Sequence, residues 1–262
     1  MSSLMKQVTV LGLAVGATLG ACAYVPLGVS HTGSPVGRVL NVSNVQTYIS
    51  YPPGGAVGSK AILIATDIYG LPGLQNRLVA DSIARANYTV VLPDLFRGDA
   101  VPFNSAGGPA YNLTEWRARH PQAAIDAIIN STLKYIRNEL NVTRVGGAGY
   151  CFGGKQVPRW LAAGKGIDVG FIAHPTDLLE SEIEAIAGPI SIAAGELDAT
   201  FNATARRIAE DILERKNLTF ETSLYADAPH AFALRVDVNN RRQKYAKEAS
   251  YFQAVQWFDY WL

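Results

Sequence analysis

Residues 146–154 read GGAGYCFGG, and this stretch decides the fold. Its central part, 149–153, has the form G-x-C-x-G, which is typical of a sharp turn between a strand and a helix with a nucleophile at its tip. Glycine is needed on both sides of the turn because larger side chains would clash there. The helix that follows would direct its N-terminal dipole at the thiol of Cys151, which favours a thiolate and a developing oxyanion.

The sequence around Cys151 supports a nucleophile over the simpler alternative. A free cysteine is more often a small buried apolar side chain, so the motif alone does not decide. Residues 143–148 have the composition of a short buried strand, and residues 155–163 can form a helix although they contain Pro158. Strand, turn and helix are the context that this motif requires, and we therefore expect a nucleophile elbow.

Short apolar runs alternate with helical patterns along the rest of the chain. The expected strands are 61–66, 89–93, 143–149, 169–173, 189–193 and 220–225. The expected helices are 76–86, 121–140, 155–163, 177–186, 200–215 and 241–262. The strands show little polar alternation, which is typical of parallel strands covered on both faces. This order predicts an α/β fold: a mostly parallel, doubly wound sheet with helices on both faces, which binds ligands beyond the carboxyl ends of its strands.

Length and charge narrow the classes of function. A chain of 262 residues suits one large domain, which we expect over 51–262, preceded by an extension over 24–50. The formal net charge is +1 and no basic stripe is visible, so a nucleic acid is not an expected partner. No His, Cys or carboxylate spacing typical of a metal site occurs, and we expect neither a metal nor another cofactor.

The first 23 residues resemble a secretory signal peptide. Lys6 is followed by an uncharged run over 8–21, and small residues at Ala21 and Ala23 suit cleavage after Ala23. The expected protein is therefore secreted, without stable membrane association. Two alternatives remain open: an uncleaved anchor helix, whose glycines have small-xxx-small spacing, and a bacterial lipoprotein signal ending at Cys22.

Seven asparagines begin an N-x-[S/T] sequon, which predicts a glycoprotein of a eukaryotic secretory pathway. They are Asn41, Asn87, Asn112, Asn130, Asn141, Asn202 and Asn217. Removal of a leader would also remove Cys22 and leave Cys151 as the only cysteine, so no intramolecular disulfide could form.

Reactive side chains follow four of the expected strands: Asp67, Cys151, Asp198 and His230. Nucleophile, acid and histidine in this chain order are typical of α/β-hydrolases. His230 would activate the thiol, and Asp198 would fix the imidazole tautomer.

Each of these assignments has a rival. His174 also follows a strand, and Asp177 could replace Asp198 as the acid. We expect His174 to hydrogen-bond a loop near the site. We place His31 in a flexible stretch near the leader, and His120 on the surface at the start of a helix.

Four motifs in the same order resemble the dienelactone hydrolase family, and closer to its fungal-type members than to its bacterial ones. They are GYCFGG at 149–154, TDIYG at 66–70, PDLFRGD at 93–99, and HAFA at 230–233 with Arg235 nearby. The resemblance runs from about residue 50 to the end of the chain.

The resemblance implies an α/β-hydrolase fold with the triad Cys151, Asp198 and His230. It also implies an oxyanion hole made of the backbone N–H groups of Ile68 and Phe152. In bacterial members a glutamate of the first motif contacts the resting thiol. Asp67 stands in its place here and is one methylene shorter.

The family's substrate carboxylate is bound by two arginines, which match Arg97 and Arg235. The alternative for both is a surface salt bridge. Tyr69 is expected in the substrate site. Residues 99–117 could cap the site, with Tyr111 and Trp116 as substrate walls.

These features together predict a hydrolase that cleaves a small ester or lactone through a cysteine acyl-enzyme, with the small molecule as its partner. A secreted α/β-hydrolase-like binding protein without turnover is one alternative. A thioester hydrolase is another.

Overall fold

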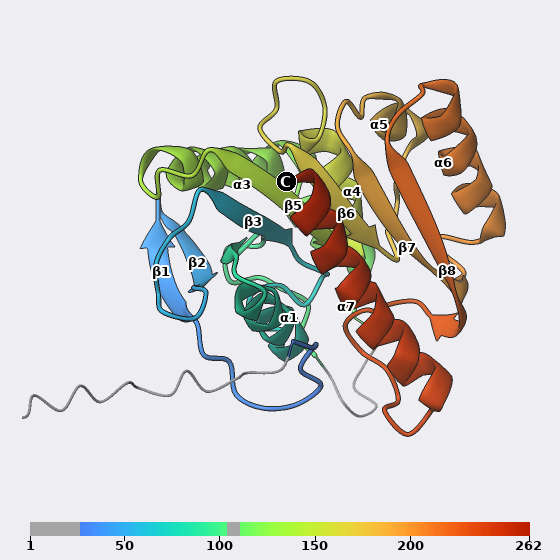
Figure 1. Ribbon diagram of the computed structural model, residues 1–262, viewed down its shortest axis with the longest axis horizontal. Coiled ribbons are helices and arrows are strands. Elements are labelled where there is room, and N and C mark those ends of the chain that lie inside the picture. Colours follow the sequence, from blue (N-terminus) through green and yellow to red (C-terminus); the bar gives the residue numbers. More distant parts are fainter. Residues whose placement is uncertain (1–26, 104–110) are drawn as a thin grey trace, which may run out of the picture.

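The computed structural model describes residues 27–103 and 111–262, which form one sheet covered by helices (Figure 1). Within these residues the sheet has eight strands in the order β1-β2-β4-β3-β5-β6-β7-β8. β3 to β8 run parallel to one another, and β1 and β2 are antiparallel to their neighbours. The strands are β1 Arg38–Val42, β2 Val45–Ser50, β3 Lys60–Ala65, β4 Thr89–Pro93, β5 Arg144–Tyr150, β6 Val169–Ala173, β7 Ile190–Leu197 and β8 Phe220–Pro229.

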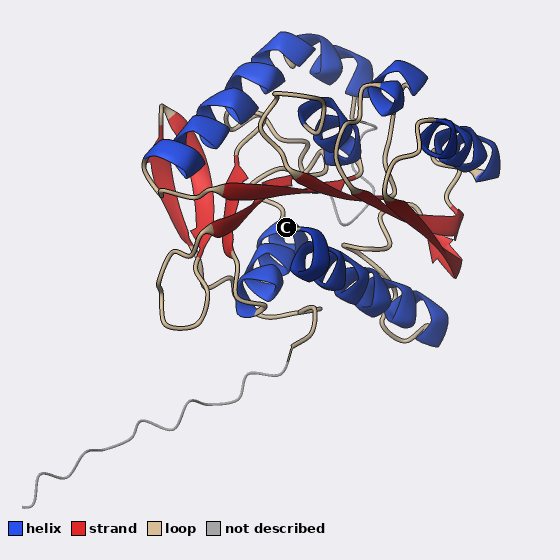
Figure 2. Cartoon of the chain, turned by 45° about the horizontal axis from the view of Figure 1, so that its top comes forward, coloured by secondary structure: helices blue, strands red, loops and turns tan. Residues whose placement is uncertain are grey.

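Helices cover both faces of the sheet, as Figure 2 shows edge-on. The helices are α1 Leu74–Arg85, α2 Leu113–Arg119, α3 Gln122–Asn138, α4 Phe152–Trp160, α5 Glu180–Glu184, α6 Ala203–Arg215 and α7 Arg241–Trp261. Alternate residues of β3 point to opposite faces, as in any strand. Ile62 belongs to the core under α1 and α7, and Leu63 to the core under α3, α4 and α6. This is the predicted doubly wound α/β-hydrolase fold.

Every strand expected from the sequence is present, but two strands were missed. β1 and β2 form a hairpin within residues 24–50, and β2 pairs with β4 so that Thr47 lies opposite Pro93. The sheet therefore begins before residue 51. The hairpin gives a weak signal because four of the five residues of β1 are exposed.

The helices differ from expectation mainly at their N-termini. α4 begins at Phe152, directly after the cysteine, and continues past Pro158. α5 is much shorter than 177–186 because Asp177 has a φ of 52°, a left-handed backbone that a helix cannot contain. The short α2 was not expected.

The leader, its cleavage after Ala23, the anchor helix and a lipidated Cys22 all lie outside the described residues. Among those described, no helix combines the length and apolar character needed to cross a membrane. His31 is held against the domain, because its Nε2 lies 3.0 Å from a Glu248 carboxylate oxygen on α7. The expectation that His31 lies in a flexible stretch is therefore wrong.

Candidate active site

The turn between β5 and α4 is a strained nucleophile elbow. Cys151 has φ 52° and ψ −111°, a backbone conformation rarely adopted by non-glycine residues and costing about 1–3 kcal/mol. A Cβ on Gly149 would overlap the carbonyl oxygen of Gly153, and one on Gly153 would overlap the carbonyl oxygen of Ala65. Both glycines of the motif are therefore required by close backbone packing.

The three expected catalytic side chains meet at the carboxyl edge of the sheet. Cys151 follows β5, Asp198 follows β7 and His230 follows β8. The thiol Sγ lies 3.1 Å from His230 Nε2, and His230 Nδ1 lies 2.9 Å from Asp198 Oδ2. The thiol and the carboxylate are buried, and the imidazole is partly exposed. One imidazole thus connects a nucleophile to a carboxylate through both of its nitrogens.

Asp198 is held as a carboxylate by the turn that follows it. Its Oδ1 accepts hydrogen bonds from the backbone N–H groups of Thr200 at 2.9 Å and Phe201 at 3.2 Å. Burial acts to raise the pKa of Asp198, but the hydrogen bonds from His230 and Thr200 outweigh burial and lower it to about 2. The group is therefore ionised at any pH at which the protein would work.

The same arrangement favours the imidazolium form of His230. Burial acts to lower the pKa of His230, whereas its hydrogen bonds to Asp198 and Cys151 raise it. The net result is a pKa of about 9, so His230 carries a proton on both nitrogens at neutral pH.

Thr200 is a member of the site that the sequence analysis missed. Its hydroxyl Oγ1 donates to Asp198 Oδ1 at 2.6 Å and lies 2.8 Å from His230 Nδ1. The hydroxyl can accept from Nδ1–H while it donates to the carboxylate, so it braces the acid and the imidazole against each other. The sequence does contain a pattern that could have indicated this role, because a threonine two residues after an aspartate often hydrogen-bonds it within a turn.

Replacing Thr200 with valine is expected to lower kcat/KM by about 10- to 100-fold, because hydrogen bonds to charged groups contribute about 1.5–3 kcal/mol. The alkaline limb of the pH–rate profile should move to lower pH, since His230 loses support for its charged form. Thr200→Ser keeps the hydroxyl and should restore both quantities. Equal losses in both variants, with an unmoved alkaline limb, would reduce Thr200 to a packing residue.

The rival residues do not contact the thiol. His174 is fully buried, and neither ring nitrogen has a hydrogen-bond partner among the described residues. Its ring stands nearly perpendicular to the His230 ring at a centroid distance of 5.3 Å. Burial first, and the nearby His230 second, lower the pKa of His174 well below its usual value, so it is a neutral packing residue. It does not make the loop hydrogen bond that we expected of it.

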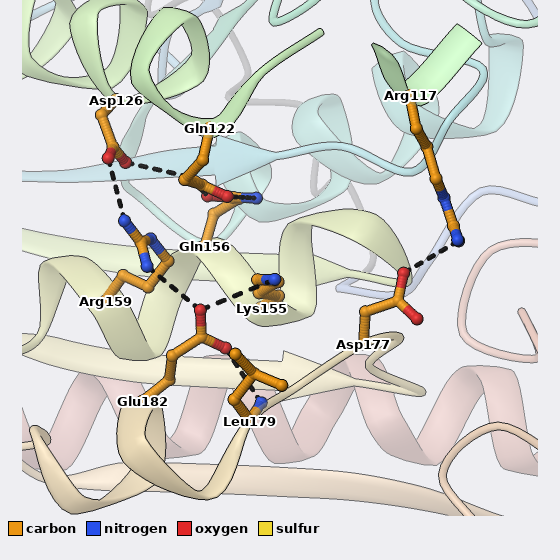
Figure 3. A network of polar contacts seen from close by, with 9 residues as sticks. All are labelled: Arg117, Gln122, Asp126, Lys155, Gln156, Arg159, Asp177, Leu179 and Glu182. Atoms are coloured by element: carbon orange, nitrogen blue, oxygen red, sulfur yellow. Dashed lines mark hydrogen bonds and ion pairs between the residues drawn. The ribbon is translucent and has the colours of Figure 1, made fainter. Parts of the chain in front are cut away.

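Asp177 is also separate from the triad. Its carboxylate pairs with Arg117 of α2 at 2.8 Å, and both side chains are more than half exposed (Figure 3). The backbone nearby belongs to the site, however, because the N–H of Thr176 donates to the carbonyl of Cys151 at 3.1 Å. Thr176 Oγ1 lies 3.9 Å from the thiol Sγ and is a further neighbour that the sequence did not indicate.

The two amides expected to form an oxyanion hole lie at the same edge of the sheet. Phe152 is the first residue of α4, and Ile68 lies in the loop after β3. Neither N–H donates a hydrogen bond to any residue that the structure describes. The Ile68 loop is fixed on both sides, since Gly70 N–H donates to Asp67 and Val101 N–H donates to the Ile68 carbonyl.

Asp67 occupies a different place from the one that direct thiol contact would require. Its buried carboxylate accepts hydrogen bonds from Tyr69 N–H at 3.0 Å and Asn76 Nδ2 at 2.8 Å, and it forms an ion pair with Arg235. No contact between this carboxylate and Cys151 is formed. The Asp67 side chain instead pairs with Arg235 and hydrogen-bonds the loop that contains Ile68.

Arg235 and Tyr69 line a cavity of about 540 Å³. The guanidinium lies over the Tyr69 ring, 4.7 Å from its centre, and the other walls are mostly apolar. The buried Lys247 lies behind this end of the cavity, with Nζ 3.0 Å from the Oε1 of Gln75 in the wall. Burial first and Arg235 second lower the pKa of Lys247 to about 8. Sequence reasoning did not find this second cation.

Arg97 is not part of this cavity. Its side chain is exposed and donates to the carbonyl of Asn44 in the β1–β2 turn at 3.3 Å. The expected pair of arginines is therefore not brought together. The neighbouring Gly98 does line the cavity, but the Arg97 side chain, on a residue with φ 51°, reaches the β1–β2 turn instead.

The expected substrate walls in the cap also have other roles. Trp116 is fully buried, donates its indole N–H to the Asp99 carbonyl at 2.7 Å and packs against Phe96 and Phe152. Trp116 thus packs against the first residue of α4 and supports the elbow. Tyr111 is exposed, and its hydroxyl accepts from Arg119. Residues 104–110 of the cap lie outside the described residues.

His120 is also not the surface residue that we expected. Its side chain is largely buried at the end of α2, where Nε2 lies 3.0 Å from an Asp99 carboxylate oxygen.

A polar network joins α4 to its neighbours α3 and α5 (Figure 3). Arg159 of α4 pairs with Asp126 of α3 at 2.9 Å and with Glu182 of α5 at 3.1 Å. Gln122 and Gln156 add a hydrogen bond between α3 and α4 at 2.7 Å. The helix that presents Phe152 N–H is thus fixed by both of its neighbours. Among the described residues, no group of three or more His, Cys, Asp or Glu is placed to hold a metal ion.

The sheet order, the elbow and the three strand-end side chains define an α/β-hydrolase. Residues 45–262 match the model of the dienelactone hydrolase family, and the chain belongs to that family. It is therefore a carboxylic ester or lactone hydrolase.

Two fungal hydrolases are among its relatives. The chain is 39% identical over 235 residues to hydrolase pyvD of Aspergillus violaceofuscus, covering 90% of this chain and 94% of the relative. It is 38% identical over 250 residues to hydrolase tropI of Talaromyces stipitatus, covering 92% and 96%. A putative dienelactone hydrolase from Klebsiella pneumoniae has the same fold, with a TM-score of 0.73 at 16% identity over 87% of this chain and all of that one.

Proposed function

We propose that this hydrolase cleaves a small ester or lactone through an acyl-enzyme on Cys151. The observation that carries the proposal is the unbroken contact from Sγ to His230 Nε2, and from His230 Nδ1 to Asp198 Oδ2, at the tip of a strained elbow. The pKa of about 9 at His230 supports an imidazole that takes up the thiol proton at Nε2 and later delivers it to the leaving group. The thiolate is the attacking species in this proposal.

In the first half-reaction the thiolate Sγ attacks the acyl carbon, and a C–S bond forms. The carbonyl electron pair moves to oxygen, where the N–H groups of Ile68 and Phe152 would stabilise the oxyanion; each such donor contributes about 3–4 kcal/mol. The C–O bond then breaks, and the leaving alkoxide takes the proton from His230 Nε2. In a lactone this alkoxide stays attached to the acyl group.

The second half-reaction releases the acid. Neutral His230 takes a proton from a water molecule, whose oxygen attacks the thioester carbon while Asp198 stabilises the imidazolium that forms. The C–S bond breaks, the thiolate is regenerated and the carboxylic acid leaves. His230 keeps the proton, so the resting pair is restored and the overall reaction consumes one water.

The activity itself is tested with a panel of aryl esters and small lactones, each with and without a carboxylate. Turnover of at least one member by the wild-type chain, and none by the chain without its thiol, is the expected result. A wild-type chain that turns over no member, with a thiol that iodoacetamide does not alkylate, would contradict the proposal.

We further propose that the cavity lined by Tyr69 and Arg235 receives an apolar group with a carboxylate at one end. One nitrogen of Arg235 is paired with Asp67, and Arg235 is among the residues that line the cavity. The buried Lys247 adds positive charge near Arg235. A carboxylate there would be bound by charge-assisted hydrogen bonds.

Arg235→Gln is therefore expected to lower kcat/KM about 10- to 100-fold for a carboxylate-bearing lactone and to change its methyl ester little. Arg97→Gln is the matched control, since Arg97 is exposed and donates to the β1–β2 turn, and it should change the rate for neither substrate. Steady-state kinetics on both substrates measures the difference.

Arg235→Gln alone leaves the buried Asp67 without its cation, which can destabilise the fold. The double variant Asp67→Asn with Arg235→Gln removes that charge and separates the two effects. If the double variant still discriminates between the acid and its methyl ester as the wild type does, Arg235 does not bind the carboxylate.

We also propose that the protein is secreted and carries N-linked glycans. All seven sequon asparagines have exposed side chains in the described structure, including Asn141 beside β5. Exposure is what glycan attachment at a folded surface requires.

Protein produced in a eukaryotic host should begin at Tyr24 and carry glycan at several of the seven sites. Intact-mass and peptide mass spectrometry, before and after enzymatic deglycosylation, measures both features. A chain that retains Met1 and is unmodified at every sequon would contradict secretion.

A further inference from the structure

One edge of the sheet is formed by β8, whose ten residues make it the longest strand in the described part of the chain. β7 covers one side of β8, and no strand among the described residues covers the other. A long edge strand presents a row of free N–H and C=O groups, which proteins normally protect or pair. Leu224, near the middle of β8, is 51% exposed and adds an apolar side chain to this edge.

Helix α7 adds an exposed aromatic stripe beside this edge. Tyr245, Phe252 and Tyr260 are 66%, 40% and 80% exposed, and their spacing of seven and eight residues places them on one face of the helix. A groove of about 840 Å³ runs between this helix and the odd-numbered residues of β8. Exposed apolar surface of this extent is typical of a binding interface, in which aromatic residues are enriched.

Opposite charges lie at two places along this edge, one at the start of β8 and one near its middle. Glu221 lies in the groove at the start of β8, where its carboxylate accepts a hydrogen bond from Ser191 at 2.7 Å. Arg241 and Arg242 line a second hollow beside Leu224–Ala226, further along the same edge. Within the described residues, none of these three charged side chains forms an ion pair.

We propose that β8 and the aromatic stripe of α7 form the interface of a homodimer, in which β8 pairs antiparallel with β8 of a second copy. The charges identify the occupant as another copy of this chain. An acid at one end of a surface and two bases further along it are complementary when the same surface is turned by a two-fold axis. An unrelated partner would need no such self-complementarity.

The strand pairing restricts where the axis can lie, and the charges then favour a position near Ser223. Residues opposite each other in an antiparallel pair point to the same face, so odd-numbered residues must meet odd-numbered residues. An axis at Ser223 places Glu221 opposite Tyr225 of the second copy, beside the hollow that holds its Arg241 and Arg242. The same axis keeps both α7 helices on one face of the continuous sheet, so their aromatic stripes flank the new strand pair.

The test is the mass of the full-length protein in solution, measured by light scattering after size exclusion. The protein concentration is set at about 10 µM, because the fraction of dimer depends on concentration. We expect twice the mass of one chain. Glu221→Arg, and the double variant Arg241→Glu with Arg242→Glu, should each raise the dimer dissociation constant at least tenfold by placing like charges together. Combining all three changes should restore the dimer.

Val39→Lys is the matched control, because Val39 is exposed on β1 at the opposite edge of the sheet. It should leave the dimer intact. Restoration in the combined variant cannot result from misfolding, so the proposal does not depend on any single variant folding well. A monomeric wild type overturns the proposal, as does a dimer that Val39→Lys disrupts and the charge reversals do not.

Discussion

Cys151→Ala is expected to reduce kcat/KM for every substrate of the panel by several orders of magnitude, because the covalent route is lost. The fold should survive, since the change removes one sulfur from a turn that is held by its glycines and by the packing of Phe152. Steady-state kinetics together with a thermal melt measures both effects.

Cys151→Ser is the informative companion to the alanine variant. It keeps a nucleophilic atom within reach of His230 and should retain residual activity above that of Cys151→Ala. If the alanine variant hydrolyses esters at the wild-type rate, another residue is the nucleophile and the mechanism is wrong.

His230→Gln is expected to produce the second largest loss, about 10²- to 10⁴-fold in kcat/KM. The change removes the group that holds the thiol proton and later delivers it to the leaving alkoxide. His174→Gln is the matched control, because His174 is a buried histidine next to His230 with no contact to the thiol. It should retain at least about a tenth of the wild-type kcat/KM.

The pH dependence follows from the same imidazole. The proposed first step needs His230 protonated, so kcat/KM should fall as pH rises through its pKa of about 9. Asp198, with a pKa of about 2, remains ionised across the whole range and should add no limb near neutral pH. A profile that is flat to pH 10.5 or above, or that rises through pH 9, would show that the imidazolium is not the acid.

The sequence predicted the parts of the fold that depend on local pattern. The apolar runs of β4 and β6 matched to the residue, and the elbow followed from Gly149 and Gly153, whose roles are steric and therefore visible in composition. The β1–β2 hairpin was missed because its stability comes from pairing with β4, a contact distant in sequence. Tertiary pairing of this kind leaves little trace in a single chain.

The candidate site shows the same division. Residues that directly follow strand ends, such as Asp198 and His230, were located because parallel strands deliver their ends to one edge. Residues whose roles depend on the direction of the side chain were not assigned correctly from the sequence. Arg97 reaches the β1–β2 turn, Trp116 packs inward, and Lys247 of the last helix contacts Gln75 in the cavity wall.

The central claim is an acyl group on Cys151, and the most direct measurement is the intact mass of the protein quenched in acid during turnover of a slowly hydrolysed aryl ester. The account predicts an added mass equal to the acyl group, located on the peptide that contains Cys151. The adduct should be absent from Cys151→Ala and should decay when substrate is exhausted. An adduct on any other residue, or rapid turnover with no adduct under conditions in which deacylation is slowed, would contradict it.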